Sequence, residues 1–160
     1  VIKKSTFTYV RQKQMLGLGH AILTGKPLIG NEPFAVILAD DLCDCNEKSV
    51  ISQMIEIYDQ HQCSVVAIEE VPMNQTHKYG VIAGKLVKNS INTYKVSDMV
   101  EKPKEKDAPS NMAIIGRYIL TPDIFNILEN IKSVINGEIQ ITDALKKQAK
   151  DDVRINLLDF

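Results

Sequence analysis

The sequence predicts a three-layer α/β domain built on a mixed β-sheet. Two observations carry this prediction. Short apolar runs without polar alternation are typical of strands covered on both faces, and the segments between them hold apolar residues at helical spacing. Strands that alternate with helices pack as a sheet with helices on its faces. With 160 residues, 44% hydrophobic and 24% charged, the chain is expected to form one domain with a substantial core.

The first half of the chain alternates strands with helices. Alternation and β-forming residues predict a strand where the sequence reads STFTYVRQ, and continuous apolar runs predict two buried strands. The predicted elements are, in order, a strand over Ser5–Gln12, a helix that begins at His20 after the turn of Gly17 and Gly19 and breaks at Gly25 and Pro27, a buried strand over Phe34–Ala39, an amphipathic helix over Lys48–His61, and a second buried strand over Ser64–Val71.

The second half is richer in strands. KYGVIAG, NTYKVSDMVEKP and NMAIIGRYIL read as strands, and the charged segment KPKEKDAPSN reads as a loop. Thr121-Pro122-Asp123 predicts a helix start with Thr121 as the N-cap, followed by a buried stripe of Ile124, Ile127, Leu128 and Ile131. A last helix is predicted from Thr142 to Lys150, and the final residues, VRINLLDF, read as a strand.

Two adjacent acids, Asp40 and Asp41, end the buried strand in FAVILADD. In open α/β sheets the carboxyl ends of strands are where ligands bind. The acids are open to three interpretations: solvated helix caps, a phosphoacceptor pocket, or ligands for a hard cation. Because adjacent side chains on an extended backbone point in opposite directions, we expect one of the two to bind a cation, and one carboxylate with substrate phosphates is the usual way to hold Mg²⁺.

An acid and a base, Glu101 and Lys102, end a later strand at VEKP. In a strand their side chains should diverge and serve two ligands or two places rather than each other, with Glu101 accepting hydrogen bonds from hydroxyls and Lys102 meeting a phosphate, unless they are an ordinary surface pair. GLGHA and KYG read first as turns, whose glycines also permit close approach of the backbone to a ligand.

Composition narrows the classes of function. The net charge of −1 gives no basic footprint for nucleic acid, and no apolar run reaches the length of a membrane helix. The three cysteines form no disulfide framework, which suits a reducing, cytoplasmic setting, and Cys43-x-Cys45 has no second pair that would make a metal site. We also expect a homo-oligomer.

Taken in order, YVRQKQMLGLGHA, FAVILADD, KYGVI, MVEKPKEKDAPSNMAIIGRYIL and EIQITDAL closely resemble the bacterial UTP–glucose-1-phosphate uridylyltransferases, which belong to the sugar-1-phosphate nucleotidylyltransferases. The resemblance implies a Rossmann-like α/β/α nucleotide-diphospho-sugar transferase fold. It also implies Mg²⁺-dependent transfer from UTP to glucose 1-phosphate. Residues 1–160 correspond to the central part of one domain, without the family's first strands, its Gly-rich N-terminal loop and its C-terminal segment.

The resemblance also implies roles for single residues. Gln12 would pair with the uracil edge, the loop of Gly17 would approach the base, and Asp40 would ligate the catalytic Mg²⁺, with Asp41 as its neighbour. Lys102 would bind the phosphate of the sugar. The remaining residues, implied at or near the sugar, are Gly80, Glu101, Asn111, Gly116 and Tyr118.

Three other interpretations remain open. A receiver domain also has an acidic pair and a Lys-Pro, but it needs an aspartate after the strand that here ends AIEEVP. A related enzyme that uses dTTP or another sugar phosphate would differ by few contacts. A non-catalytic sugar-nucleotide-binding module is the third, because the implied Gly-rich loop has no match in this chain.

Overall fold

The computed structural model describes residues 4–44, 48–131, 137–150 and 156–159. Within them six strands form one sheet in the order β1-β5-β2-β6-β4-β3, and β3 also pairs with β5. The strands are β1 (Phe34–Ile37), β2 (Val65–Glu70), β3 (Gly80–Leu86), β4 (Thr93–Glu101), β5 (Met112–Leu120) and β6 (Asn156–Asp159). The sheet is mixed, since β2 and β6 run parallel while the other pairs are antiparallel.

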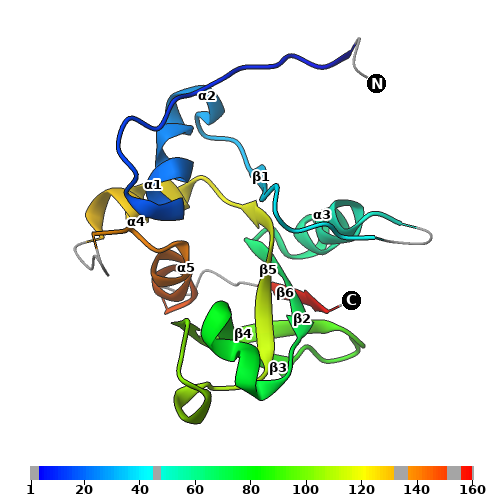
Figure 1. The fold of residues 1–160 in the computed structure, drawn as a ribbon. Coiled ribbons are helices and arrows are strands. Elements are labelled where there is room, and N and C mark those ends of the chain that lie inside the picture. The colour runs from blue at the N-terminus through cyan, green and yellow to red at the C-terminus, as the bar shows by residue number, and fades with distance from the viewer. Residues whose placement is uncertain (1–3, 45–47, 132–136, 151–155, 160) are drawn as a thin grey trace.

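Helices cover both faces of this sheet, as Figure 1 shows for α3 on one side of β5 and for α4 and α5 on the other. The helices are α1 (Gly17–Thr24), α2 (Lys26–Ile29), α3 (Val50–His61), α4 (Asp123–Asn130) and α5 (Ile141–Lys150), with 3₁₀ turns η2 (Met73–Lys78) and η3 (Glu105–Asp107). The three-layer α/β prediction is therefore confirmed. None of the helices in the described part of the chain is long and apolar enough to cross a membrane.

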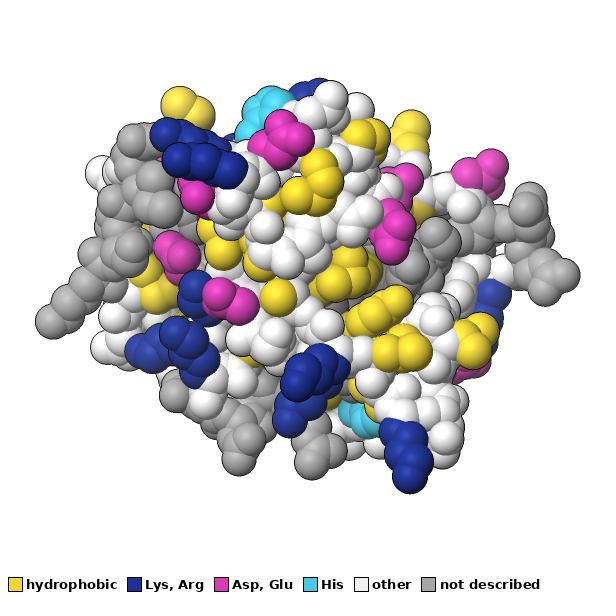
Figure 2. Space-filling model, turned by 90° about the horizontal axis from the view of Figure 1, so that it is seen from below, with side chains coloured by type: hydrophobic (Ala, Val, Ile, Leu, Met, Phe, Trp, Pro, Cys, Tyr) yellow, Lys and Arg dark blue, Asp and Glu magenta, His cyan; other side chains and the backbone are white. Residues whose placement is uncertain are grey.

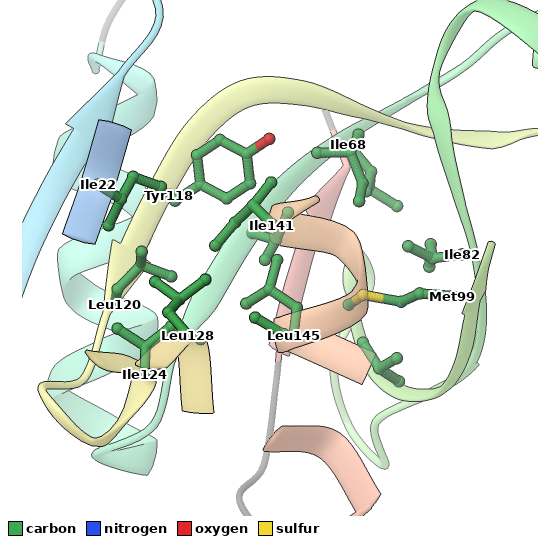
Figure 3. Packing of buried hydrophobic residues seen from close by; sticks show 14 of the residues in the cluster. Ile22, Ile68, Ile82, Met99, Tyr118, Leu120, Ile124, Leu128, Ile141 and Leu145 are labelled. Carbon is green, nitrogen blue, oxygen red and sulfur yellow. The ribbon is translucent and has the colours of Figure 1, made fainter. Parts of the chain in front are cut away.

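Side-chain alternation along β2 explains why its apolar run is buried on both faces. Val65 and Ala67 pack with α3 in one cluster, whereas Val66 and Ile68 pack with the helices of the opposite face in another. Figure 3 shows the second cluster, in which Ile141 and Leu145 of α5 point toward the sheet. A period of two thus places consecutive residues in different cores.

The predicted strand over Ser5–Gln12 is wrong. These residues form no strand in the structure and lie largely exposed, with Tyr9 92% exposed. Figure 1 shows this segment extending away from the body of the molecule. Strand propensity describes side chains that suit a pleated surface, but a strand also needs a neighbouring backbone to pair with, and the described residues offer none here.

The strand over Phe34–Ala39 is shorter and less covered than predicted. β1 ends at Ile37, and within the described residues it pairs with β5 alone. Its residues alternate between half-buried and exposed, with Ile37 58% exposed. Phe34 stacks on Phe125 of α4 at 5.1 Å between ring centroids, which covers one face. Burial on both faces is therefore wrong for this strand within the described residues.

The helix predictions hold in position, with differences at the ends. α3, α4 and α5 match their predicted ranges within two residues, and Ser49 caps α3 by accepting a hydrogen bond from the backbone N–H of Ser52. α1 begins at Gly17 rather than His20 and ends at Thr24, as the predicted break at Gly25 requires, whereas Pro27 lies in the first turn of the short α2. The N-cap role predicted for Thr121 is wrong, because its hydroxyl is bonded to Ser64 and Gln148 in a buried network.

The molecular surface mixes charges of both signs. Figure 2 shows one face on which lysine and arginine side chains are interspersed with acidic and apolar ones.

The last predicted strand corresponds to β6, which lies between β2 and β4 in the sheet, and its neighbours 151–155 and 160 are outside the described residues.

Candidate functional site

A cavity of about 370 Å³ opens where the middle of β5 lies beside the loop after β1, the end of β4 and the starts of β3 and α5. This volume is in the range of small-molecule sites. Six of the nine site residues expected from the sequence line it: Asp40, Gly80, Glu101, Lys102, Gly116 and Tyr118. The structure therefore gathers residues that are up to 78 positions apart in the chain (118 − 40) into one place.

The loop that carries Asp40 is fixed from β5. Arg117, only 8% exposed, donates to the carbonyl oxygens of Leu38 (2.9 Å) and of Asp41, one on each side of Asp40. The backbone N–H of Gly116 donates to the Asp41 carboxylate at 2.8 Å, and the Leu38 N–H donates back to the Gly116 carbonyl at 2.8 Å. Asp41 is thus a structural anchor, whereas the Asp40 carboxylate has no hydrogen-bond or ion-pair partner among the described residues.

The space beside Gly116 explains why a glycine stands there. A Cβ on this residue would lie 2.6 Å from the Leu38 Cβ and 2.7 Å from an Asp41 carboxylate oxygen. Contacts that short are not tolerated, so the close approach of β5 to the loop requires the absence of a side chain.

Glu101, the last residue of β4, also lines the cavity. It faces Gly80 across β3 and β4, and because the Lys102 N–H donates to the Tyr79 carbonyl (2.9 Å), Gly80 and Glu101 form a non-hydrogen-bonded pair. The backbone N–H of Gly80 therefore points away from β4. Thr142 at the start of α5 donates from Oγ1 to Glu101 Oε2 at 2.5 Å.

Lys102 adopts an unusual backbone conformation. Its φ of +44° lies in the left-handed region, where a residue with a side chain is strained by about 1–2 kcal/mol, and the buried Pro103 that follows restricts it further. Strain of this kind gathers at functional sites. The side chain is 62% exposed and its Nζ lies 4.0 Å from Glu101 Oε1. Glu101 and Lys102 thus line one cavity, with Lys102 just beyond the end of β4, and separate ligands for the two residues stay a prediction.

Tyr118, a buried residue of β5, also lines the cavity. Figure 3 shows its ring beside the apolar cluster with the hydroxyl oxygen directed away from it. Burial raises the pKa of Tyr118 well above its usual range, and the charges of Glu101, Asp41 and Asp40 raise it further. The phenol therefore keeps its proton and remains a hydrogen-bond donor beside three carboxylates.

The other three expected residues do not line the cavity. Gln12 and Gly17 lie together, since the Gln12 amide donates to the Gly17 carbonyl at 3.2 Å and contacts His20 Nδ1 at 2.9 Å. Their neighbour Leu18 does line the cavity. Asn111 precedes β5, and its carbonyl oxygen accepts the backbone N–H of Val71 at 3.0 Å.

The GLG turn packs against the chain itself. A Cβ on Gly17 or Gly19 would lie 2.9 or 2.7 Å from the carbonyl oxygen of Ile139, and Gly19 donates its N–H to that oxygen at 2.9 Å. Gly17 also has a φ of +86°, which favours glycine. Close packing against Ile139 therefore accounts for both glycines, without any ligand.

Several lining residues received no role from the sequence, notably Glu138, Gln140 and Thr142. All three belong to EIQIT within the motif EIQITDAL, so the signal was present as a pattern without an assigned chemistry. Arg117, in IIGRY, likewise received no role from the sequence. Its hydrogen bonds reach Leu38 and Asp41, which lie 79 and 76 positions earlier in the chain.

The described part of the chain contains no metal site built from protein ligands alone. No group of three or more His, Cys, Asp or Glu residues there could hold a metal ion. Cys43 and Cys63 form no disulfide within the described residues, and Cys45 lies outside them.

Comparisons with known proteins agree with this geometry. The family model described as nucleotidyl transferase matches residues 2–158. A curated relative from Pseudomonas aeruginosa named UTP–glucose-1-phosphate uridylyltransferase is 60% identical over 152 residues, which is 94% of this chain and 54% of the relative. The chain therefore spans about half the length of the curated relatives that it matches.

Solved structures give the same result. A UDP-glucose pyrophosphorylase complexed with UDP-glucose superposes with a TM-score of 0.94 at 61% identity, covering 99% of this chain and 60% of the other. A UTP-bound UGPase from Acinetobacter baumannii superposes with a TM-score of 0.82 at 35% identity, covering 94% of this chain and 51% of the other.

Proposed function

This chain belongs to the nucleotidyl transferase family, and we propose that it is the central part of a domain that makes UDP-glucose from UTP and glucose 1-phosphate. The observation that carries the proposal is the cavity, which is lined by two charges of opposite sign, Asp40 and Lys102, together with a carboxylate that can accept from hydroxyls, Glu101. The names of the relatives support the same substrates.

The reaction requires positioning more than acid–base chemistry. A phosphate oxygen of glucose 1-phosphate forms a bond to the α-phosphorus of UTP, the bond from that phosphorus to the bridging oxygen breaks, and pyrophosphate leaves with the electron pair. The nucleophile is already an anion, so no general base is needed. Lys102 is proposed to hold the sugar phosphate as a point charge, and Glu101, with the Gly80 N–H and the Tyr118 hydroxyl, to bind the sugar hydroxyls.

Asp40 is the residue proposed to hold Mg²⁺. Its carboxylate lines the cavity without a protein partner in the described chain, whereas one oxygen of Asp41 accepts the Gly116 N–H. A single carboxylate fits an ion that takes its other ligands from phosphates and water. Bound there, Mg²⁺ would supply neutralisation of phosphate charge.

The nucleotide end of the site is proposed at Gln12 and Gly17, with Gly116 and Asn111 near the sugar as the family resemblance implies. The amide of Gln12 now contacts Gly17 and His20, so it would exchange these contacts for the uracil edge. We propose a cytoplasmic setting on the basis of the cysteine usage, and a homo-oligomer stays a prediction.

The test is a chimera in which this chain replaces the matching segment of the Pseudomonas aeruginosa relative, because that relative is nearly twice as long. Pyrophosphate release is followed with Mg²⁺, glucose 1-phosphate and either UTP or dTTP. We expect release with UTP that stops when EDTA removes the metal. Equal rates with dTTP would refute the base assignment, and no release with either nucleotide would refute the proposed function.

A further inference from the structure

Thr142 has no role in the proposed function, yet its hydroxyl is hydrogen-bonded to a residue of the site, Glu101. It is the second residue of α5, its exposed fraction is 3%, and its Oγ1 lies 2.5 Å from Glu101 Oε2. An ionised carboxylate can only accept, so the threonine hydroxyl is the donor. The bond joins residues 41 positions apart and links α5 to the end of β4.

This bond makes the two oxygens of Glu101 unlike. Oε2 is held by Thr142, whereas Oε1 is directed toward the side of Lys102, whose Nζ lies 4.0 Å away. A glutamate side chain has several rotatable bonds, and a charge-assisted bond to a fixed donor removes most of that freedom. The side chain of Glu101 is only 17% exposed, so solvent does not compete strongly for Oε2.

Gly80 shows how closely these groups fit. A Cβ on Gly80 would lie 2.9 Å from Thr142 Oγ1 and 3.2 Å from Glu101 Oε2. The start of β3, the end of β4 and the start of α5 therefore meet at one hydrogen bond. Thr142 lies in the first turn of α5, and the positive end of a helix dipole favours a carboxylate that is bound there.

We propose that Thr142 is a positioning residue that fixes the Glu101 carboxylate and leaves Oε1 to accept a hydrogen bond from a sugar hydroxyl. The inference rests on the proposed function, because it requires glucose 1-phosphate to bind in this cavity. A threonine buried only for packing would be replaced by valine without loss of binding, since valine has nearly the same shape. The hydroxyl is therefore the quantity to test.

The experiment measures the affinity of this chain for glucose 1-phosphate by amide chemical-shift titration, which detects millimolar binding. Hydrogen bonds to charged groups are worth enough for Thr142→Val to weaken binding about tenfold or more, whereas Thr142→Ser should stay within about threefold of the wild type. In a chain that already carries Glu101→Ala, adding Thr142→Val should change nothing further. Thermal unfolding checks that each variant folds, and Thr142→Ala replaces the valine variant if that one does not.

The outcomes separate the two claims. If the wild-type chain binds no glucose 1-phosphate, the proposed function of the cavity fails and takes this inference with it. If the wild type binds and Thr142→Val binds equally well, or if the serine variant loses as much as the valine variant, only the inference fails. An effect of Thr142→Val that persists without Glu101 would also overturn it, because the threonine would then act by another route.

Discussion

Gly116→Ala tests whether the close approach of β5 to the Asp40 loop is required for stability. The added Cβ would meet Leu38 Cβ at 2.6 Å, an Asp41 oxygen at 2.7 Å and Leu38 Cγ at 2.8 Å. Two of these three atoms belong to a half-buried leucine and the third to an anchored carboxylate, so relief requires the loop to move.

The expected cost follows from three contributions. Overpacking of this kind costs about 1–3 kcal/mol, and weakening the bond from the Gly116 N–H to the Asp41 carboxylate adds up to about 1.5 kcal/mol. Replacing glycine by alanine restricts the unfolded chain, which returns about 0.4–1 kcal/mol. The net loss is therefore about 2 kcal/mol, equivalent to a urea midpoint about 1 M lower at an m-value of about 2 kcal/mol/M.

Urea unfolding followed by circular dichroism measures this loss. Gly25→Ala is the matched control, because Gly25 has an ordinary helical φ of −78° and its Cβ would meet atoms only at 3.2 and 3.3 Å. We expect the control to shift the midpoint by less than half as much. If Gly116→Ala is as stable as Gly25→Ala, the tight packing of the loop against β5 is not a constraint and the reasoning is wrong.

Three further predictions concern single charges. Asp41→Asn should lower the unfolding free energy more than Asp40→Asn, whereas Asp40→Asn should remove more turnover from the chimera, and the reverse ranking would refute both roles. Lys102→Gly should leave stability unchanged or raise it by up to about 1 kcal/mol, because it relieves the left-handed strain, yet weaken glucose 1-phosphate binding as much as Lys102→Ala does. The bond from Lys146 holds the pKa of Asp98 below its usual value of 3.8, so its contribution to stability is complete above that pH and is lost as the pH falls through the lowered value. Because Asp98 is 45% exposed, Asp98→Asn should cost under about 1 kcal/mol at pH 7, and a cost that persists at pH 2 would contradict the assignment.

The sequence predicts most elements but not how much of each is covered. The runs Phe34–Ala39 and Ser64–Val71 look alike, yet β2 is buried on both faces and β1 is not. The local sequence pattern indicates which environments a strand can tolerate, whereas the burial of its faces depends on which other elements pack against it. The same limit explains Thr121, a good N-cap by type whose hydroxyl is bonded instead to Gln148, 27 positions later.

For the candidate site, too, the sequence predicts local features but not the contacts between distant residues. Acids and bases at strand ends are visible in the sequence, because strand ends and residue types are local features. The groups that fix them are not visible, because Arg117 and Thr142 reach their partners only after the sheet has formed. A buried threonine or arginine in a list of residues has too many ordinary uses to be singled out without its partner.

The two adjacent charged pairs of the cavity share one principle. In each pair one member is anchored to the fold. Asp41 accepts a hydrogen bond from the Gly116 N–H, and Glu101 accepts one from the Thr142 hydroxyl. Its neighbour, Asp40 or Lys102, has a side chain that no close hydrogen bond holds within the described residues. Anchoring one residue restrains the backbone of its neighbour, so the neighbouring charge is positioned while its own hydrogen-bonding groups stay available. A charge aimed in this way keeps its full interaction for a ligand, which is the condition for electrostatic preorganisation.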